Sequence, residues 1–118
     1  MPATTASRDS RSARELFAKD AINEALALFH RRWTLRVLWE LRAGALTFRA
    51  LQARCGDISP TVLNQRLAEL REVALLATDE GGYRLSALGE DLIVAFGPLS
   101  QWAQRWRRAR PSAKSPSR

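Results

Sequence analysis

Residues 47–73 read TFRALQARCGDISPTVLNQRLAELREV, and this stretch decides the fold. It predicts two short helices, each preceded by a side chain suited to cap it: Thr47 before the first and Ser59 before the second. Pro60 stands at the first position of the second helix, where its missing N–H is not needed. A turn of only three residues, 56–58, separates the helices and begins with glycine. Two helices joined by so short a turn predict a helix-turn-helix.

A hydrophobic residue before each cap supports both helix starts. Each of these residues has a hydrophobic partner in the first turns of the helix that follows, the arrangement known as a hydrophobic staple. The two pairs are Leu46 with Leu51 and Ile58 with Leu63. We therefore expect the first short helix over residues 48–55 and the second over about 59–73.

Two helices are expected before this motif. Hydrophobic residues recur at helical spacing over residues 14–30, which predicts an amphipathic helix. A second helix is expected from about Trp33 to a stop at residues 43–44, where Gly44 follows Ala43.

A hairpin and a long helix are expected after it. The short apolar segments 75–78 and 83–85 flank a turn of the sequence Asp-Glu-Gly-Gly, which predicts a tight β-hairpin. Ser86 is a suitable cap for a final helix, and Gly97 followed by Pro98 should kink that helix or split it. The expected fold is mostly α with a small β-hairpin (α+β): a winged helix-turn-helix with N- and C-terminal dimerisation helices.

The ends of the chain differ in composition from its middle. Residues 1–12 are expected to be a disordered leader, residues 13–109 the winged helix-turn-helix domain, and residues 110–118 a disordered basic tail. The net charge is +7, and from Arg105 onward there are six basic residues and no acidic one. The tail alone therefore predicts nonspecific affinity for an anionic polymer, and specific DNA binding has to be argued from the middle of the chain.

Composition also bounds the class of protein. The hydrophobic fraction of 46% is that of a globular chain, and no apolar run reaches the length needed to cross a bilayer, so no membrane partner is expected. A single cysteine, Cys55, cannot form an internal disulfide, which favours a cytoplasmic location.

The order of these elements resembles the HxlR-type family of winged helix-turn-helix transcription regulators. Five groups of residues between about 20 and 108 carry the resemblance. They are Trp33-Thr34-Leu35 with Val37-Leu38; Gly44 with residues 47–51; Ile58-Ser59 with Leu63, Arg66-Leu67 and Leu70; residues 83–86 with Gly89 and Leu92; and Leu99 with Trp102. The chain departs from the family in having no cysteine ahead of the first helix and a shorter hairpin without prolines. The resemblance implies a homodimer, formed through the first and last helices, that binds a two-fold DNA operator.

The second short helix is the predicted DNA-reading element. With its leucines facing inward, helical periodicity places a set of small and amide side chains outward, where they can contact base edges in the major groove. These predicted base-contacting residues are Thr61, Asn64, Gln65 and Ala68. The predicted phosphate-contacting residues are Ser59, Arg49, Arg54, Arg66, Arg71 and Arg84. For Arg66 an ion pair with a neighbour is an equal alternative.

The predicted dimer interface joins hydrophobic residues of the first and last helices, which one small core cannot cover. They are Phe17, Ile22, Phe29, Leu92, Phe96, Leu99, Trp102, Ala103 and Trp106. The predicted function is that of a homodimeric, sequence-specific regulator of transcription that binds double-stranded DNA. The alternative is a winged-helix protein-interaction module whose basic tail supplies nonspecific nucleic-acid affinity.

Chemistry of other kinds finds little support in the sequence. No phosphate-binding glycine loop, catalytic serine turn or His/Cys cluster is present, so we expect no enzyme, no cofactor and no metal, and His30 alone is not a metal site. Cys55 is interpreted as a small buried residue rather than a redox sensor. A small-molecule effector is left open, with Trp33, Trp39 and Trp102 as residues that could line its pocket.

Overall fold

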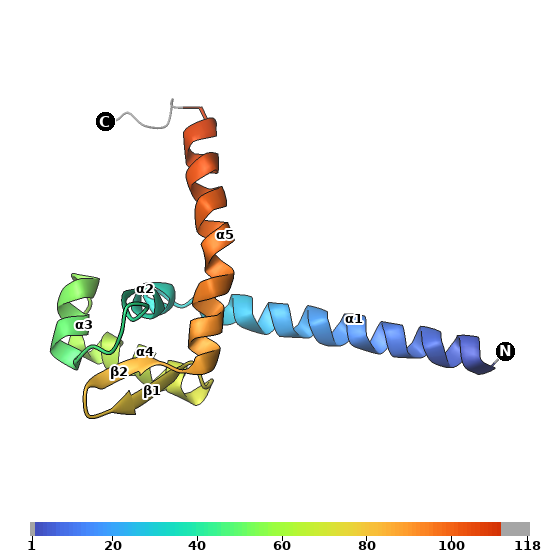
Figure 1. The fold of residues 1–118 in the computed structure, drawn as a ribbon, viewed down its shortest axis with the longest axis horizontal. Helices are drawn as coiled ribbons and strands as arrows, with labels where there is room; N and C mark the ends of the chain where they lie inside the picture. The colour runs from blue at the N-terminus through green and yellow to red at the C-terminus, as the bar shows by residue number, and fades with distance from the viewer. Residues whose placement is uncertain (1, 112–118) are drawn as a thin grey trace. The chain divides into compact units, whose positions relative to one another are not determined.

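The computed structural model describes residues 2–111 and divides into two compact units, one up to Leu35 and the other from Arg36 on. The elements follow one another as the order of helices, hairpin and final helix predicted (Figure 1). They are α1 Pro2–Phe29, α2 Thr34–Glu40, α3 Phe48–Cys55, α4 Pro60–Glu72, β1 Leu76–Asp79, β2 Gly82–Leu85 and α5 Ala87–Ala109. The expected architecture, mostly α with a small hairpin, is confirmed.

The first unit consists mainly of α1. This helix begins at Pro2, earlier than the start at Arg14 that the sequence predicted, and it includes residues of the expected leader. Proline is well suited to the first turn of a helix, and residues 3–29 contain neither glycine nor a further proline to interrupt it. After α1 the backbone turns at Trp33, whose φ is +80°, and α2 therefore begins only at Thr34.

The core lies in the second unit and is built from leucines of the helix-turn-helix and of the elements around it. Leu38, Leu51, Leu63 and Leu70 are all fully buried. At about 25 cal/mol per Å² of buried apolar surface, side chains of this kind supply the main driving force for folding. The predicted inward face of α4 is thus the face that anchors it.

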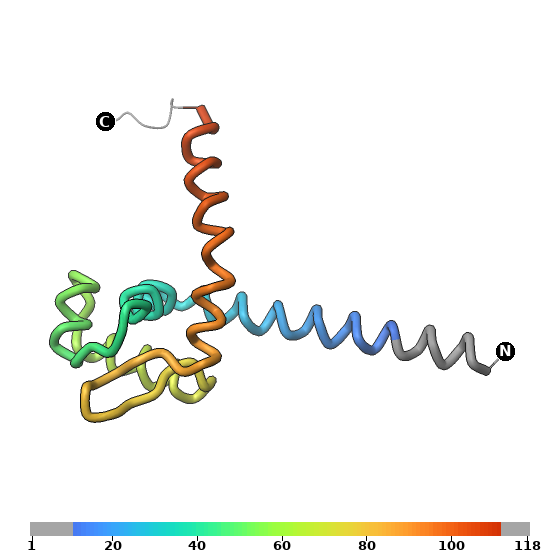
Figure 2. Tube along the Cα trace, viewed as in Figure 1, coloured from blue at the N-terminus to red at the C-terminus, as the bar shows by residue number. Residues whose placement is uncertain are grey.

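The hairpin is joined to the segment before α3. β1 and β2 pair antiparallel, with Leu76 opposite Leu85, and β2 is bridged on its other side by Leu46. The Leu46 and Tyr83 backbones exchange two hydrogen bonds, of 2.9 and 2.8 Å, and the chain path in Figure 2 shows the hairpin returning to this segment. Gly82 has φ +114°, and a Cβ there would lie 2.3 Å from the Leu46 carbonyl oxygen. Only glycine allows β2 to lie this close to the backbone of Leu46.

α5 starts against the hairpin and continues beyond it. The Ser86 hydroxyl accepts a hydrogen bond from the Gly89 N–H at 3.1 Å and donates one to the Ala74 carbonyl at 2.7 Å. Of the two effects predicted for residues 97–98, the split does not occur, because α5 runs unbroken through Pro98, and the kink stays a prediction. A proline removes one backbone hydrogen bond, and this long helix keeps the bonds on either side of it. Among residues 2–111, no helix combines the length and apolar character that a bilayer crossing requires.

Candidate nucleic-acid interface

Capping hydrogen bonds fix the two helices of the helix-turn-helix at the residues that the sequence predicted. The Thr47 hydroxyl accepts from the Ala50 N–H at 3.1 Å, and the Ser59 hydroxyl accepts from the Val62 N–H at 3.1 Å. Each bond satisfies a backbone donor that the helix itself leaves without a partner.

The turn between them is held from both sides. Gly56 ends α3 with φ +86°, a conformation that favours glycine. The Gln52 side-chain amide donates to the Ile58 carbonyl across the turn at 3.4 Å. Because Ile58 is itself buried, the start of α4 has little freedom to move relative to α3.

α4 has one anchored face and one open face. Leu63, Leu67 and Leu70 are buried, whereas the predicted base-contacting residues are all exposed. These exposed residues are Thr61, Asn64, Gln65 and Ala68. Their side chains come from the first three turns of the helix, next to its capped N-terminus. The polar side of α4 is therefore exposed, and an α-helix is of a size that the major groove of DNA admits.

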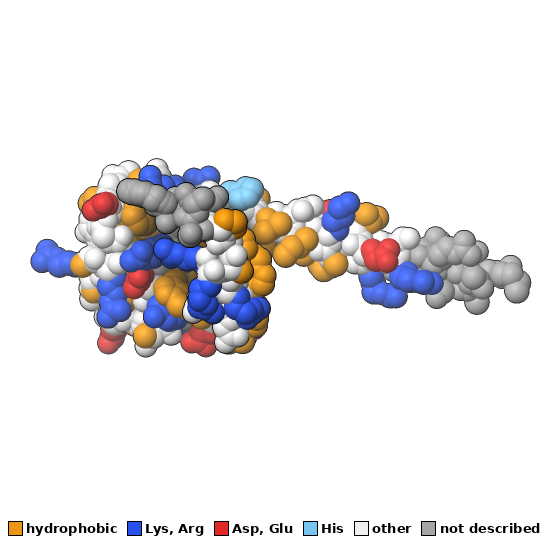
Figure 3. Space-filling view, turned by 90° about the horizontal axis from the view of Figure 1, so that it is seen from above, with side chains coloured by type: hydrophobic (Ala, Val, Ile, Leu, Met, Phe, Trp, Pro, Cys, Tyr) orange, Lys and Arg blue, Asp and Glu red, His pale blue; other side chains and the backbone are white. Residues whose placement is uncertain are grey.

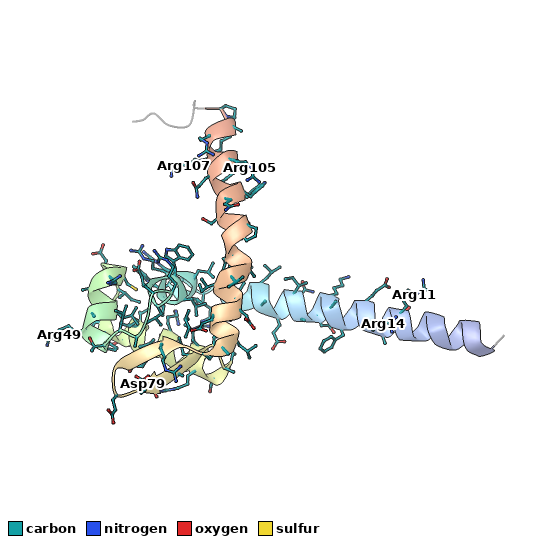
Figure 4. All side chains as sticks on the ribbon, in the orientation of Figure 1. Arg11, Arg14, Arg49, Asp79, Arg105 and Arg107 are labelled. Carbon is teal, nitrogen blue, oxygen red and sulfur yellow. The ribbon has the colours of Figure 1, made fainter. Side chains whose placement is uncertain are left out.

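Three of the predicted phosphate-contacting arginines are exposed cations without an ion pair to any residue in the described part of the chain. Arg49 and Arg54 lie on α3 and Arg71 lies in the last turn of α4. Figure 4 shows Arg49 pointing away from the body of the unit. Exposed guanidinium groups that flank an open polar helix face are suited to contact a nucleic-acid backbone.

Arg66 lies differently from these three. Its Nη1 is 3.0 Å from the Glu69 carboxylate, and only 11% of its side chain is exposed. Of the two roles predicted for Arg66, this geometry favours the ion pair with a neighbour over the phosphate contact.

Arg84, on the hairpin, is also paired. Its Nε donates to the Asp79 carboxylate at 2.8 Å, and the other oxygen of Asp79 accepts from the Gly81 N–H at 2.8 Å. The bond from Arg84, followed by that from the Gly81 N–H, holds the pKa of Asp79 below its ordinary value. Asp79 is therefore charged at neutral pH. It forms an ion pair with Arg84, the arginine that the sequence analysis predicted to contact a phosphate.

An arginine that the sequence did not single out connects α2 to α3. Arg36 Nε lies 2.7 Å from the Glu40 carboxylate, and Arg36 Nη2 donates to the Arg54 carbonyl at 2.9 Å. A cation at the C-terminal end of a helix satisfies a free carbonyl and interacts favourably with the helix dipole. The spacing of four residues between Arg36 and Glu40 predicts their pairing, but nothing in the sequence predicts the bond to Arg54.

Cys55 closes α3 as a buried residue, 4% exposed, as the sequence interpretation required. Burial raises the pKa of its thiol, the Arg36 charge opposes this, and the Glu40 charge adds to it. We therefore expect a thiol-reactive disulfide reagent at pH 8 to modify Cys55 much more slowly in the folded protein than in urea, since only the accessible thiolate reacts. Equal rates, measured by absorbance of the released thiolate, would contradict this structural role.

The predicted dimer residues belong to two different helices, and five of the nine are exposed. On α1, Phe17 and Ile22 are exposed and Phe29 is half-buried. On α5, Leu99, Trp102 and Trp106 are about half exposed, and the rings of Trp102 and Trp106 stack with centroids 5.6 Å apart. The remaining predicted residues are half-buried: Leu92, Phe96 and Ala103. Figure 3 looks onto the C-terminal end of α5, where basic side chains lie among exposed hydrophobic ones.

Each of the three tryptophans considered for an effector pocket lies against another side chain, and the Arg32 guanidinium is 5.2 Å from the centre of the Trp33 ring. The Arg42 guanidinium stacks on the Trp39 ring at 4.1 Å, and Trp102 stacks on Trp106. A shallow pocket in the second unit does not include them. It is lined by Glu40, Ala43, Gly44, Ala45, Leu46 and Arg54. Within the described residues, no three His, Cys, Asp or Glu side chains gather in a group that could hold a metal ion.

Comparison with known proteins matches most of the chain to a helix-turn-helix family. The family model described as HxlR-like helix-turn-helix matches residues 28–111. The chain is 34% identical over 97 residues to the uncharacterized HTH-type transcriptional regulator Rv3095 of Mycobacterium tuberculosis, which covers 76% of this chain and 61% of the relative. It is 27% identical over 90 residues to the uncharacterized HTH-type transcriptional regulator YvaP of Bacillus subtilis, covering 70% of this chain and 83% of that one. The chain thus spans about three-fifths of the length of the mycobacterial relative.

Solved structures share the fold. Quinone-bound YodB from B. subtilis superposes with a TM-score of 0.69 at 24% identity, over 73% of this chain and 98% of that one. A possible HxlR family transcriptional factor from Thermoplasma volcanium gives a TM-score of 0.63 at 24% identity, over 70% and 81% of the two chains. These likenesses confirm the winged helix-turn-helix architecture.

Proposed function

The chain belongs to the HxlR-like helix-turn-helix family of transcription regulators, and on that premise we propose that it binds double-stranded DNA as a homodimer, with α4 in the major groove. The observation that carries the proposal is the division of α4 into a buried leucine face and an exposed polar face beside a capped N-terminus. A helix presented in this way fits the major groove of B-DNA.

The exposed side chains of α4 are suited to distinguish bases. Asn64 and Gln65 carry amides that can pair with adenine through two hydrogen bonds, and Thr61 and Ala68 can contact a thymine methyl group. The hydroxyl of Ser59 can donate to a phosphate while its oxygen continues to accept from the Val62 N–H. The residues suited to contact bases and the serine suited to contact a DNA phosphate thus lie near the N-terminal end of the same helix.

The homodimer is supported by hydrophobic surface on α5. Val94, Leu99, Trp102 and Trp106 are 75%, 51%, 49% and 48% exposed, more apolar surface than a monomeric helix usually leaves in water. A second copy of the chain is the occupant that its family membership favours. A two-fold dimer would set the two α4 helices about 34 Å apart, one turn of DNA, or a multiple of it.

Gln65 tests the groove assignment. Replacing Gln65 by alanine should lower discrimination at one base pair of each half-site by about 1–3 kcal/mol and leave nonspecific affinity nearly unchanged, because the amide contacts a base and not a phosphate. Fluorescence anisotropy with DNA selected by the purified protein, and with single-base variants of it, measures the change.

The matched control is Gln101→Ala, which changes another exposed glutamine, on α5. It should keep the base preference of the wild type. If Gln65→Ala and Gln101→Ala both discriminate as the wild type does on every variant, α4 is not the reading helix.

A further inference from the structure

The tip of the hairpin has a charge pattern that binding to DNA does not explain. Residues 79–84 read DEGGYR, two carboxylates and one guanidinium, so this tip has a net charge of −1. The labelled Asp79 lies at the hairpin in Figure 4, on the β1 side of the turn. A negative charge next to DNA opposes binding, because the phosphates are themselves anionic.

The single arginine of the tip is held by one of those carboxylates. Arg84 Nε and Asp79 Oδ2 are 2.8 Å apart, and their side chains are 48% and 44% exposed. Asp79 is in turn oriented by the Gly81 N–H, which donates to Oδ1 at 2.8 Å. The pair is therefore built into the turn. A phosphate that approached Arg84 would have to compete with a carboxylate already in place, or lie close to that carboxylate and be repelled by it.

We propose that Asp79 limits the affinity of this protein for DNA by holding the Arg84 guanidinium in an ion pair, so that the β1–β2 hairpin, the wing of the fold, adds no phosphate contact. The inference rests on the proposed DNA-binding function and deepens it: backbone contacts come from the arginines of α3 and α4, and Asp79 is a positioning residue that acts through Arg84. The hairpin of this protein then lowers its affinity for DNA. An arginine at the same place without an ion pair would raise that affinity.

The test is a set of four variants measured by anisotropy with double-stranded DNA over a range of salt concentrations. Asp79→Asn should raise affinity about three- to tenfold, and its salt dependence should steepen by about 2, one phosphate for each subunit of the dimer. The asparagine keeps an oxygen that can accept from the Gly81 N–H, so the turn should persist. Arg84→Ala should stay within about twofold of the wild type, because a retained arginine contributes no contact to lose.

Glu80→Gln is the matched control, since it removes one negative charge from the same turn without releasing Arg84. It should give a smaller gain than Asp79→Asn and no steeper salt dependence. In the double variant Asp79→Asn/Arg84→Ala the gain should fall to that of Glu80→Gln.

Two results would overturn the inference alone: Arg84→Ala weakening binding as much as Arg49→Ala does, or Asp79→Asn binding no more tightly than Glu80→Gln. Absence of salt-dependent DNA binding by the wild type would overturn the proposed function, and the inference with it. Because the first two results presuppose a wild type that binds, the two failures are distinguished.

Discussion

Gly89→Ala is expected to lower the free energy of unfolding by about 1–3 kcal/mol, the usual range when an extra methyl group is forced into a packed site. Gly89 is buried in the first turn of α5, where a Cβ would lie 2.3 Å from the Leu75 carbonyl oxygen and 3.2 Å from Leu85 Cδ2. The Leu75 carbonyl cannot simply move away, because it accepts the Ser86 N–H at 3.0 Å. Urea unfolding followed by circular dichroism measures the loss.

The same helix supplies the control. Gly97 has nothing within 4 Å of its Cβ position and lies inside α5. Gly97→Ala should therefore stabilise the protein by about 0.5–1 kcal/mol, the difference in helix propensity between the two residues. If Gly89→Ala were as stabilising as Gly97→Ala, the close approach of α5 to the Leu75 carbonyl would be wrong.

DNA affinity is expected to fall about a thousandfold between about 50 and 200 mM salt. The reason is counterion release: Arg49, Arg54 and Arg71 of two subunits would neutralise about six phosphates, each contributing about 0.9 to the slope of log affinity against log salt. Arg49→Ala should weaken binding to all sequences alike and reduce the slope by about 2, two contacts for each dimer. Anisotropy titrations at several salt concentrations give both numbers.

The basic C-terminal end of the chain supplies the control for Arg49→Ala. Arg108→Ala changes an exposed arginine near the end of α5 and should leave the slope unchanged. Deleting residues 111–118 should weaken binding without abolishing it. Loss of all DNA binding on that deletion, with Arg49→Ala unaltered, would instead favour the protein-interaction module with nonspecific affinity from its tail.

The parts of the fold that the sequence predicted well are those encoded locally. Thr47, Ser59 and Ser86 each cap the helix assigned to them, because a cap depends on a side chain and a backbone N–H only three residues apart. The open face of α4 was predictable for the same reason, since periodicity alone separates its leucines from its polar residues. The leucine spacing fixed which side chains would remain for a ligand.

Most of what escaped prediction depends on contacts that no local pattern of residues encodes. Arg36 reaches the Arg54 carbonyl, and Gly89 contacts the Leu75 carbonyl, through packing that no local pattern encodes. The ion pair of Arg84 with Asp79 was also not predicted, because it depends on the register of the hairpin, which sets the two strands opposite each other. A kink or a split was predicted at residues 97–98, and α5 continues through both residues without a split.

The separation of α4 into two faces has a consequence for how such a protein could change its target. The residues that hold the helix in place are its leucines, and the residues that face outward take no part in the core. Substitutions at positions 61, 64, 65 and 68 can therefore accumulate with little penalty to folding, usually within about 0.5 kcal/mol for surface sites. New operator preferences could thus be acquired, in nature or from a randomised library, on an unchanged scaffold.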